Sequence, residues 1–194
     1  KGIKLNLVLI MVESLSAKYI DGLSGKNYGV TPNLDGLVSS SKVFSRFFAN
    51  GQRSVDGVQS IVTGVPPLPG IPDITALSSN FPSLAKIAKA NDIRTLFISS
   101  TWRESFSLDL IAKSVGFEEY YGREDYPLLL PYPEDVERSI GWDYEALMFL
   151  FEKIDIPNQR FFAYINASSD HTPFAKLQKP FNQYEHGYDT EGGY

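Results

Sequence analysis

Four side chains of this sequence could bind a divalent metal ion and provide a hydroxyl nucleophile. They are Glu13, Ser54, Asp170 and His171. Each follows a hydrophobic run, directly or after a short polar segment, and such runs are typical of buried strands that end at a sheet edge. In open α/β sheets the carboxyl edge is where binding sites form. Two carboxylates, an imidazole and a hydroxyl suit a hard metal ion beside a nucleophile.

Each of these residues also has a plain structural interpretation. Glu13 could be a solvated strand end, Ser54 could be an ordinary helix cap, and an Asp-His pair in a loop is common. Ser54 is also predicted to begin a helix, where backbone N–H groups and the helix dipole favour an alkoxide or a phosphate. Arg53 could hold a phosphoryl oxygen, and Gly51 would let the backbone approach a ligand closely. The residues alone leave both interpretations open.

Hydrophobic periodicity predicts an α/β fold, with a mostly parallel sheet and helices on both faces. The predicted strands cover residues 4–12, 43–49, 95–99 and 161–165. The predicted helices cover residues 16–20, 31–38, 54–62, 83–91, 108–115 and 143–154. The Pro- and Asp-rich segment 122–139 is predicted to be a loop.

Composition excludes several classes of protein. The 194 residues are 43% hydrophobic, which is enough for one domain with a substantial core. A net charge of −5 argues against a nucleic-acid partner, and the lack of Cys excludes disulfides and thiolate metal sites. No apolar run is long enough to span a bilayer. Both ends look like cuts through a longer protein, so we expect a C-terminal part beyond this chain.

The order of the motifs resembles the sulfatase and alkaline-phosphatase superfamily. The segment 6–15 is similar to its first metal-ligand strand, and the Thr-Pro-Asn-Leu-Asp-Gly-Leu segment 31–37, followed by 44–51, is similar to the helix and strand before its nucleophile. The Pro and Arg of the sulfatase nucleophile motif are missing after Ser54, which disfavours a formylglycine sulfatase. A narrower resemblance, to lipoteichoic acid synthases and phosphoglycerol transferases, depends on Glu13, Gly51-Gln-Arg-Ser54, Pro66-Pro-Leu-Pro-Gly70 and Ser169-Asp-His-Thr-Pro-Phe174.

The resemblance implies a site and a fold. It makes Glu13, Ser54, Asp170 and His171 the ligands of one divalent metal ion, with Mn²⁺ favoured over Mg²⁺, Zn²⁺ or Ca²⁺. Ser54 becomes the nucleophile, and Arg53 would stabilise charge on the phosphoryl oxygens. The fold becomes an alkaline-phosphatase-like sandwich over residues 1–194, incomplete at its C-terminus.

Other residues have weaker assignments. Trp102 and Arg103 lie in the region that binds phosphoglycerol in the family, but at shifted positions, so helix capping and surface exposure remain an equal interpretation. Asp35 and Asp56 are predicted to serve helix termini, and Asp56 could also support the site. His186 is predicted to be an ordinary surface residue.

The implied activity is transfer of a phosphoglycerol group from a phosphatidylglycerol-like lipid to a polyol or glycan acceptor, through a covalent phospho-serine. The alternatives are a phosphodiesterase, a sulfatase, a phosphoethanolamine transferase or a non-catalytic binding domain. The family also implies a location on the extracytoplasmic side of a bacterial membrane, with the membrane segments outside this chain.

Overall fold

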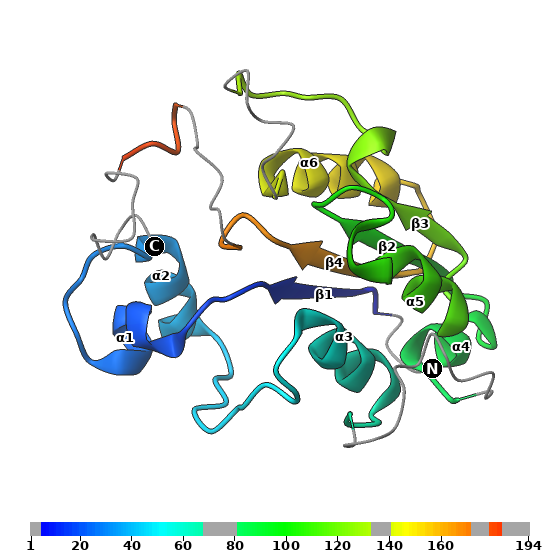
Figure 1. Cartoon of the computed structure of the whole chain (residues 1–194), viewed down its shortest axis with the longest axis horizontal. Coiled ribbons are helices and arrows are strands. Elements are labelled where there is room, and N and C mark those ends of the chain that lie inside the picture. The colour runs from blue at the N-terminus through cyan, green and yellow to red at the C-terminus, as the bar shows by residue number, and fades with distance from the viewer. Residues whose placement is uncertain (1–4, 68–80, 133–140, 172–178, 184–194) are drawn as a thin grey trace.

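A computed structural model describes residues 5–67, 81–132, 141–171 and 179–183. Its centre is a four-stranded parallel sheet in the order β1-β4-β2-β3 (Figure 1). The strands are β1 (Leu7–Val12), β2 (Arg94–Ser99), β3 (Glu119–Tyr121) and β4 (Phe161–Ala167). The predicted α/β class and the parallel sheet are confirmed.

Strand β4 lies in the interior of the sheet, and all seven of its residues are buried. It pairs with β1 over residues 162–167 on one side and with β2 over residues 161–166 on the other. A strand that is buried on both faces needs apolar residues on both, and its sequence Phe-Phe-Ala-Tyr-Ile supplies them. This explains why the hydrophobic run predicted a strand correctly.

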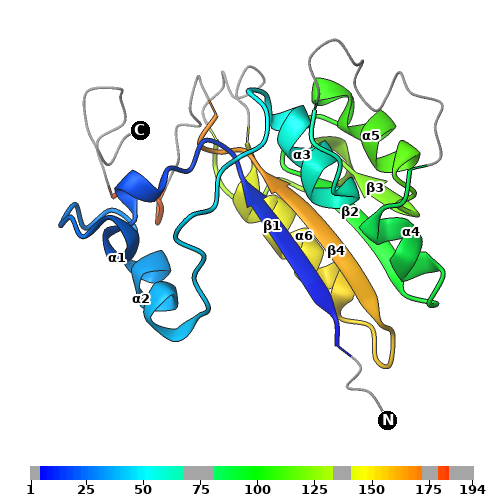
Figure 2. The same ribbon diagram turned by 90° about the horizontal axis from the view of Figure 1, so that it is seen from below.

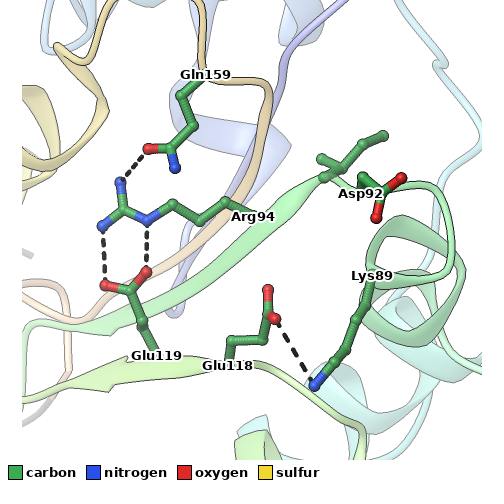
Figure 3. A pocket seen from close by; sticks show the side chains of 7 residues that line it. Lys89, Asp92, Arg94, Glu118, Glu119 and Gln159 are labelled. Carbon is green, nitrogen blue, oxygen red and sulfur yellow. Dashed lines mark hydrogen bonds and ion pairs between the residues drawn. The ribbon is translucent and has the colours of Figure 1, made fainter.

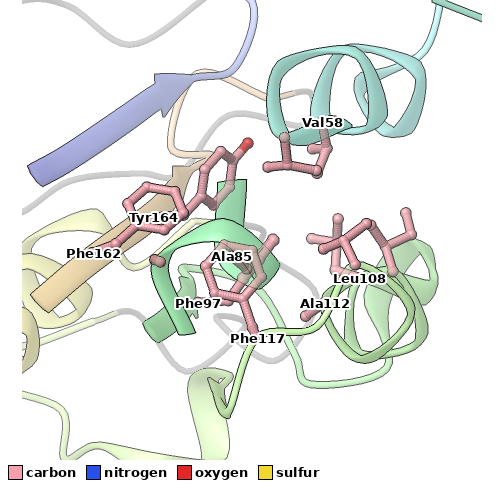
Figure 4. Close-up of a cluster of buried hydrophobic side chains, with 12 residues drawn as sticks. Val58, Ala85, Phe97, Leu108, Ala112, Phe117, Phe162 and Tyr164 are labelled. Carbon is pink, nitrogen blue, oxygen red and sulfur yellow. The ribbon is translucent and has the colours of Figure 1, made fainter. Parts of the chain in front are cut away.

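Helices cover both faces of the sheet. One face packs against α3 (Ser54–Thr63), α4 (Leu84–Lys89) and α5 (Leu108–Ser114), in a cluster that includes Val58, Ala85, Leu108, Phe97 and Tyr164 (Figure 4). The other face packs against α6 (Asp143–Ile154). Side chains alternate between the two clusters along β2 and β4, as the period of a strand requires.

The remaining elements are short. They are η1 (Ala17–Tyr19), α1 (Asp21–Ser24), α2 (Pro32–Ser40), η3 (Ser105–Ser107) and η4 (Arg123–Asp125). The predicted loop 122–139 therefore holds one 3₁₀ turn within its described part, residues 122–132. None of the helices in the described residues is long and apolar enough to cross a membrane.

The predicted strand 43–49 is wrong. These residues form no strand, and Phe44, Phe47 and Phe48 are 69%, 77% and 83% exposed. Their composition favours a strand, but a strand also needs a hydrogen-bonded neighbour, and the segment has none in the described sheet. The sequence missed β3, because three residues of Glu-Tyr-Tyr give too short a pattern.

Candidate active site

The first candidate ligand follows β1 at the carboxyl edge of the sheet. The backbone N–H of Glu13 donates to the carbonyl of Ala167 at 2.8 Å, which continues the pairing of β1 with β4. Burial raises the pKa of Tyr164, and the charge of Glu13 raises it further. The Glu13 carboxylate therefore lies on the same side of the site as the Tyr164 side chain of β4.

The turn after β4 carries Asp170 and His171, and hydrogen bonds from distant segments hold it. The Ser168 N–H donates to Asp143 Oδ1 at 2.7 Å and to Ser100 Oγ at 2.9 Å. The Ser169 N–H donates to Asp143 Oδ2 at 3.1 Å. Within the turn, the His171 N–H donates to the Ser168 carbonyl at 3.0 Å. The turn is thus fixed against the ends of β2 and α6.

The Asp170 carboxyl has an unusual environment. Burial raises its pKa to about 6, and the nearby charge of Asp143 adds to the effect. No hydrogen bond to the Asp170 carboxylate is present within the described ranges. A cation bound nearby would stabilise the charged form of a half-buried carboxylate that lies beside a second carboxylate.

The loop after β2 reaches the turn that carries Asp170 and His171. The ring of Phe106 lies 5.5 Å from the ring of His171, centroid to centroid, at an interplanar angle of 43°. Phe106 and Ser107 both have positive φ values, 55° and 56°. This conformation is uncommon for bulky side chains and is concentrated at functional sites.

Ser54 is the first residue of α3, as predicted, and it is half-buried. The backbone before it is held by Asp56, which accepts from the Arg53 N–H at 3.2 Å and from Arg53 Nη2 at 3.0 Å. A Cβ added to Gly57 would lie 3.9 Å from Met11 Sδ, so the first turns of α3 lie beside the end of β1. Figure 2 shows α3 together with the strands β1 and β4, which lie side by side.

The donor chemistry of the predicted ligands fits a hard divalent cation: two carboxylates, an imidazole and a serine hydroxyl. Within the described residues, however, no group of three or more His, Cys, Asp or Glu side chains is arranged to hold a metal ion. The structure brings Glu13 to the end of β4 and places Asp170 and His171 in the next turn. The four-ligand site remains a prediction.

Trp102 and Arg103 have structural partners. The Arg103 guanidinium forms an ion pair with Asp125 and donates to the Tyr120 carbonyl at 3.2 Å. The Trp102 ring packs edge-on against Trp142, with centroids 5.3 Å apart. These contacts give both side chains a structural role that needs no substrate. Their substrate-binding role remains a prediction. His186 lies outside the described residues.

Sequence reasoning missed Asp143 as a neighbour of the site, whereas it placed the loop 99–106, which holds Ser100 and Phe106, in the region of the family's phosphoglycerol-binding residues. Asp143 was predicted only as the start of a helix, where acidic residues are common because of the helix dipole. Its contacts with residues 168 and 169 depend on the packing of α6 against the end of β4. No local pattern could have predicted them.

A hollow lies at the opposite edge of the sheet, where β2 and β3 begin. Lys89, Asp92, Ile93, Arg94, Glu118, Glu119 and Gln159 line a cavity of about 520 Å³ (Figure 3). Arg94 donates to Glu119 through two nitrogens, to Gln159 Oε1 at 3.3 Å and to the Lys153 carbonyl at 2.6 Å. The ion pairs Arg94–Glu119 and Lys89–Glu118 involve four of the charged side chains that line this hollow, and they explain it as packing of charged residues.

A comparison with known protein families decides the assignment. The model of the family described as Sulfatase matches residues 5–193. The chain belongs to the sulfatase family. The predicted membership of the sulfatase and alkaline-phosphatase superfamily is thereby confirmed.

The relatives of this sulfatase-family chain agree with the narrower resemblance. Phosphoglycerol transferase I of Salmonella arizonae is 25% identical over 97% of the chain, and that of Salmonella paratyphi B is 26% identical over 96%. The chain spans 26% and 25% of the length of these two proteins. The matched part of each relative is thus about a quarter of the protein.

Solved structures confirm the fold of the sulfatase-family chain. A protein of the alkaline phosphatase superfamily from Vibrio parahaemolyticus is 25% identical and has a TM-score of 0.82 over 100% of this chain. The lipoteichoic acid synthase LtaP from Listeria monocytogenes is 22% identical, with a TM-score of 0.74 over 97% of the chain. In both comparisons, this chain covers 47% of the solved chain. The predicted alkaline-phosphatase-like fold is confirmed, and the chain corresponds to about half of those solved chains.

Proposed function

We propose that this chain forms part of the catalytic domain of a metal-dependent phosphoglycerol transferase. The observation that carries the proposal is the match, over nearly all of the chain, to proteins named phosphoglycerol transferase I. The placement of Glu13 and the Asp170-His171 turn at one edge of the sheet supports it. The donor would be a phosphatidylglycerol-like lipid, and the acceptor a polyol or glycan hydroxyl.

Ser54 is the nucleophile in this proposal. A divalent metal ion, Mn²⁺ in the first instance, would be held by Glu13, Ser54, Asp170 and His171 and would lower the pKa of a bound hydroxyl. Ser54 Oγ forms a bond to phosphorus while the bond from phosphorus to the diacylglycerol oxygen breaks. The serine proton ends on the departing diacylglycerol. The phosphoglycerol group is then an ester of Ser54.

The second step restores the serine. The oxygen of an acceptor hydroxyl forms a bond to phosphorus, the bond to Ser54 Oγ breaks, and the proton of the acceptor returns to Ser54. The backbone N–H groups at the start of α3 stabilise negative charge on the phosphoryl oxygens. Arg53 would add a positive charge there, since its side chain is 61% exposed although it pairs with Asp56.

The test begins with metal binding. Calorimetric titration of Mn²⁺ into the wild-type protein is expected to give one site, and Asp170→Ala is expected to abolish that site. Equal binding in both proteins would contradict the proposed ligand set. In the full-length protein, Ser54→Ala should then lower the turnover of a phosphatidylglycerol donor by about 10³-fold or more, while Mn²⁺ still binds, with lower affinity, through the other three ligands.

A matched control is available in the same helix. Ser60 lies in α3, and its hydroxyl donates to the Asp56 carbonyl at 2.8 Å, so Ser60→Ala should keep nearly full turnover. A panel of phosphodiesters, phosphomonoesters and sulfate esters separates the proposed transferase from a phosphodiesterase, a sulfatase and a phosphoethanolamine transferase. Full turnover by Ser54→Ala would overturn the mechanism.

The proposed location follows from the proposed substrate. A lipid donor requires the site to lie near a membrane surface, and the proposed surface is the extracytoplasmic side of a bacterial membrane, as the family resemblance implies. Labelling of an introduced Cys by a membrane-impermeant reagent in intact cells tests this directly, because the chain has no Cys of its own. Protection from the reagent until the cells are lysed would contradict it.

A further inference from the structure

We propose that Asp143 is a positioning residue of the candidate active site, whose carboxylate clamps the turn that carries Asp170 and His171. The inference deepens the proposed function and rests on it for the role of that turn. It assigns a task to a residue that is itself neither a predicted metal ligand nor the nucleophile.

The contacts of Asp143 are directed away from its own helix. Asp143 is the first residue of α6, where an acidic side chain would ordinarily serve the helix dipole or accept from a nearby helical N–H group. Here Oδ1 accepts from the Ser168 N–H at 2.7 Å, and Oδ2 accepts from the Ser169 N–H at 3.1 Å. Two consecutive backbone donors therefore share one carboxylate, 25 and 26 residues away in sequence.

The segment before Asp143 is fitted to the same turn. Gly141 has a φ of 97°, and a Cβ at this position would lie 2.4 Å from both the backbone N and the Cα of Ser169. The Trp142 N–H donates to the Ser100 carbonyl at 2.9 Å, while the Ser100 hydroxyl accepts from Ser168. Figure 1 shows α6 and β4 side by side, and the clamp joins the start of α6 to the end of β4.

The geometry suits a ligand-bearing turn. Asp170 follows the two clamped residues directly, and the His171 N–H closes the turn on the Ser168 carbonyl. Fixing Ser168 and Ser169 therefore fixes the backbone from which both predicted ligands project. Residues that hold metal ligands in place typically change metal affinity by about 10- to 100-fold when they are mutated.

The chain offers a matched control for the clamp. Asp21 is the first residue of α1, and its two oxygens accept from the Tyr28 and Gly29 N–H groups at 2.9 and 2.8 Å. Asp21 thus makes the same pair of bonds to consecutive backbone donors, in a loop that carries no predicted ligand. If the loss of two backbone hydrogen bonds were the whole effect of the substitution, Asp143→Ala and Asp21→Ala should change Mn²⁺ affinity equally.

The experiment compares Asp143→Ala, Asp143→Asn and Asp21→Ala in the full-length protein. Amide hydrogen exchange should show faster exchange at Ser168 and Ser169 in Asp143→Ala, and only at Tyr28 and Gly29 in Asp21→Ala. Calorimetry should show Mn²⁺ affinity at least 10-fold weaker in Asp143→Ala, an intermediate loss in Asp143→Asn, which keeps one acceptor oxygen, and no change in Asp21→Ala.

The two proposals fail in different ways. Unchanged exchange at Ser168 and Ser169 in Asp143→Ala would overturn the clamp and leave the proposed function intact. Equal Mn²⁺ affinity in Asp143→Ala and Asp21→Ala would overturn the positioning role. If Asp170→Ala binds Mn²⁺ like the wild type, the proposed metal site itself is wrong, and the role of Asp143 towards the metal fails with it. Should Asp143→Ala not fold, Asp143→Asn carries the same comparisons.

Discussion

The two parts of the candidate site are built in opposite ways. The nucleophile segment, residues 51–56, has its polar contacts within itself: Asp56 accepts from the Arg53 backbone and side chain, and a Cβ on Gly51 would meet the Asp56 side chain. The ligand turn, residues 168–171, is held by Ser100 and Asp143, which come from other parts of the chain. Local sequence organises the first part, and the assembled sheet organises the second.

The difference has a consequence for stability and for function. A change at Asp56 or Gly51 should be absorbed near Ser54, because the hydrogen bonds that Asp56 accepts span only a few residues. A change at the ligand turn should also disturb α6 and the end of β2, because the same atoms connect all three. Three predictions test this contrast.

The largest effect is expected from the two glycines. Gly141→Ala places a Cβ against the backbone of Ser169, whereas Gly51→Ala places one 2.3 Å from the Asp56 Cβ. Both glycines have positive φ, which costs an alanine about 1–2 kcal/mol. Gly141→Ala should lower the free energy of unfolding by about 3 kcal/mol or more, since backbone must also move.

Gly51→Ala should cost less, about 1–3 kcal/mol, because local rearrangement of residues 51–56 can relieve the contact. Urea denaturation of both variants at one pH measures the difference. A larger loss for Gly51→Ala would break the contrast between local and tertiary support.

The next effect concerns Asp56, a buried carboxylate in the nucleophile segment. Burial raises its pKa, but the hydrogen bonds and charge of Arg53 outweigh this and hold the pKa below its ordinary value of 3.8. Its contribution is therefore present above pH 3.8 and is lost as the pH falls through the lowered value. Asp56→Asn should cost about 1–2 kcal/mol at pH 7 and progressively less towards pH 3.

Denaturant unfolding at pH 7 and pH 3 measures this dependence. A cost for Asp56→Asn that stays the same at both pH values would mean that the charge of Asp56 contributes nothing. The segment would then be held by packing alone.

The smallest effect has the opposite sign and concerns Asp170. Its pKa is raised to about 6, so the metal-free protein gains stability from Asp170 at low pH and loses that gain as the pH rises through about 6. With metal removed by a chelator, Asp170→Asn should stabilise the protein at pH 8 by roughly 1 kcal/mol, a value reduced for partial solvent screening. Below pH 4 the variant and the wild type should have nearly equal stability. Destabilisation by Asp170→Asn at pH 8 would contradict the raised pKa.

Some elements were predictable because their signal is local. The run at residues 161–165 predicted β4, since a buried parallel strand needs apolar residues on both faces. The run at residues 4–12 predicted β1 correctly as a strand, but β1 lies at the edge of the described sheet and its residues are exposed or half-buried. The Ser54 helix was predictable from apolar spacing, and its bounds differ from the prediction by one residue. The strand predicted at 43–49 failed because apolar residues supply propensity but cannot supply a hydrogen-bonded neighbour.

The sequence by itself determined the α/β class, the main helices and the family, because periodicity and ordered motifs are properties of the chain read in one dimension. It also marked Glu13, Ser54, Asp170 and His171 as candidates, because each follows a hydrophobic run. Only the tertiary structure decided that Asp143 and Ser100 hold the ligand turn and that the Phe106 ring lies against His171. Those contacts join segments that meet only when the sheet and its covering helices are assembled.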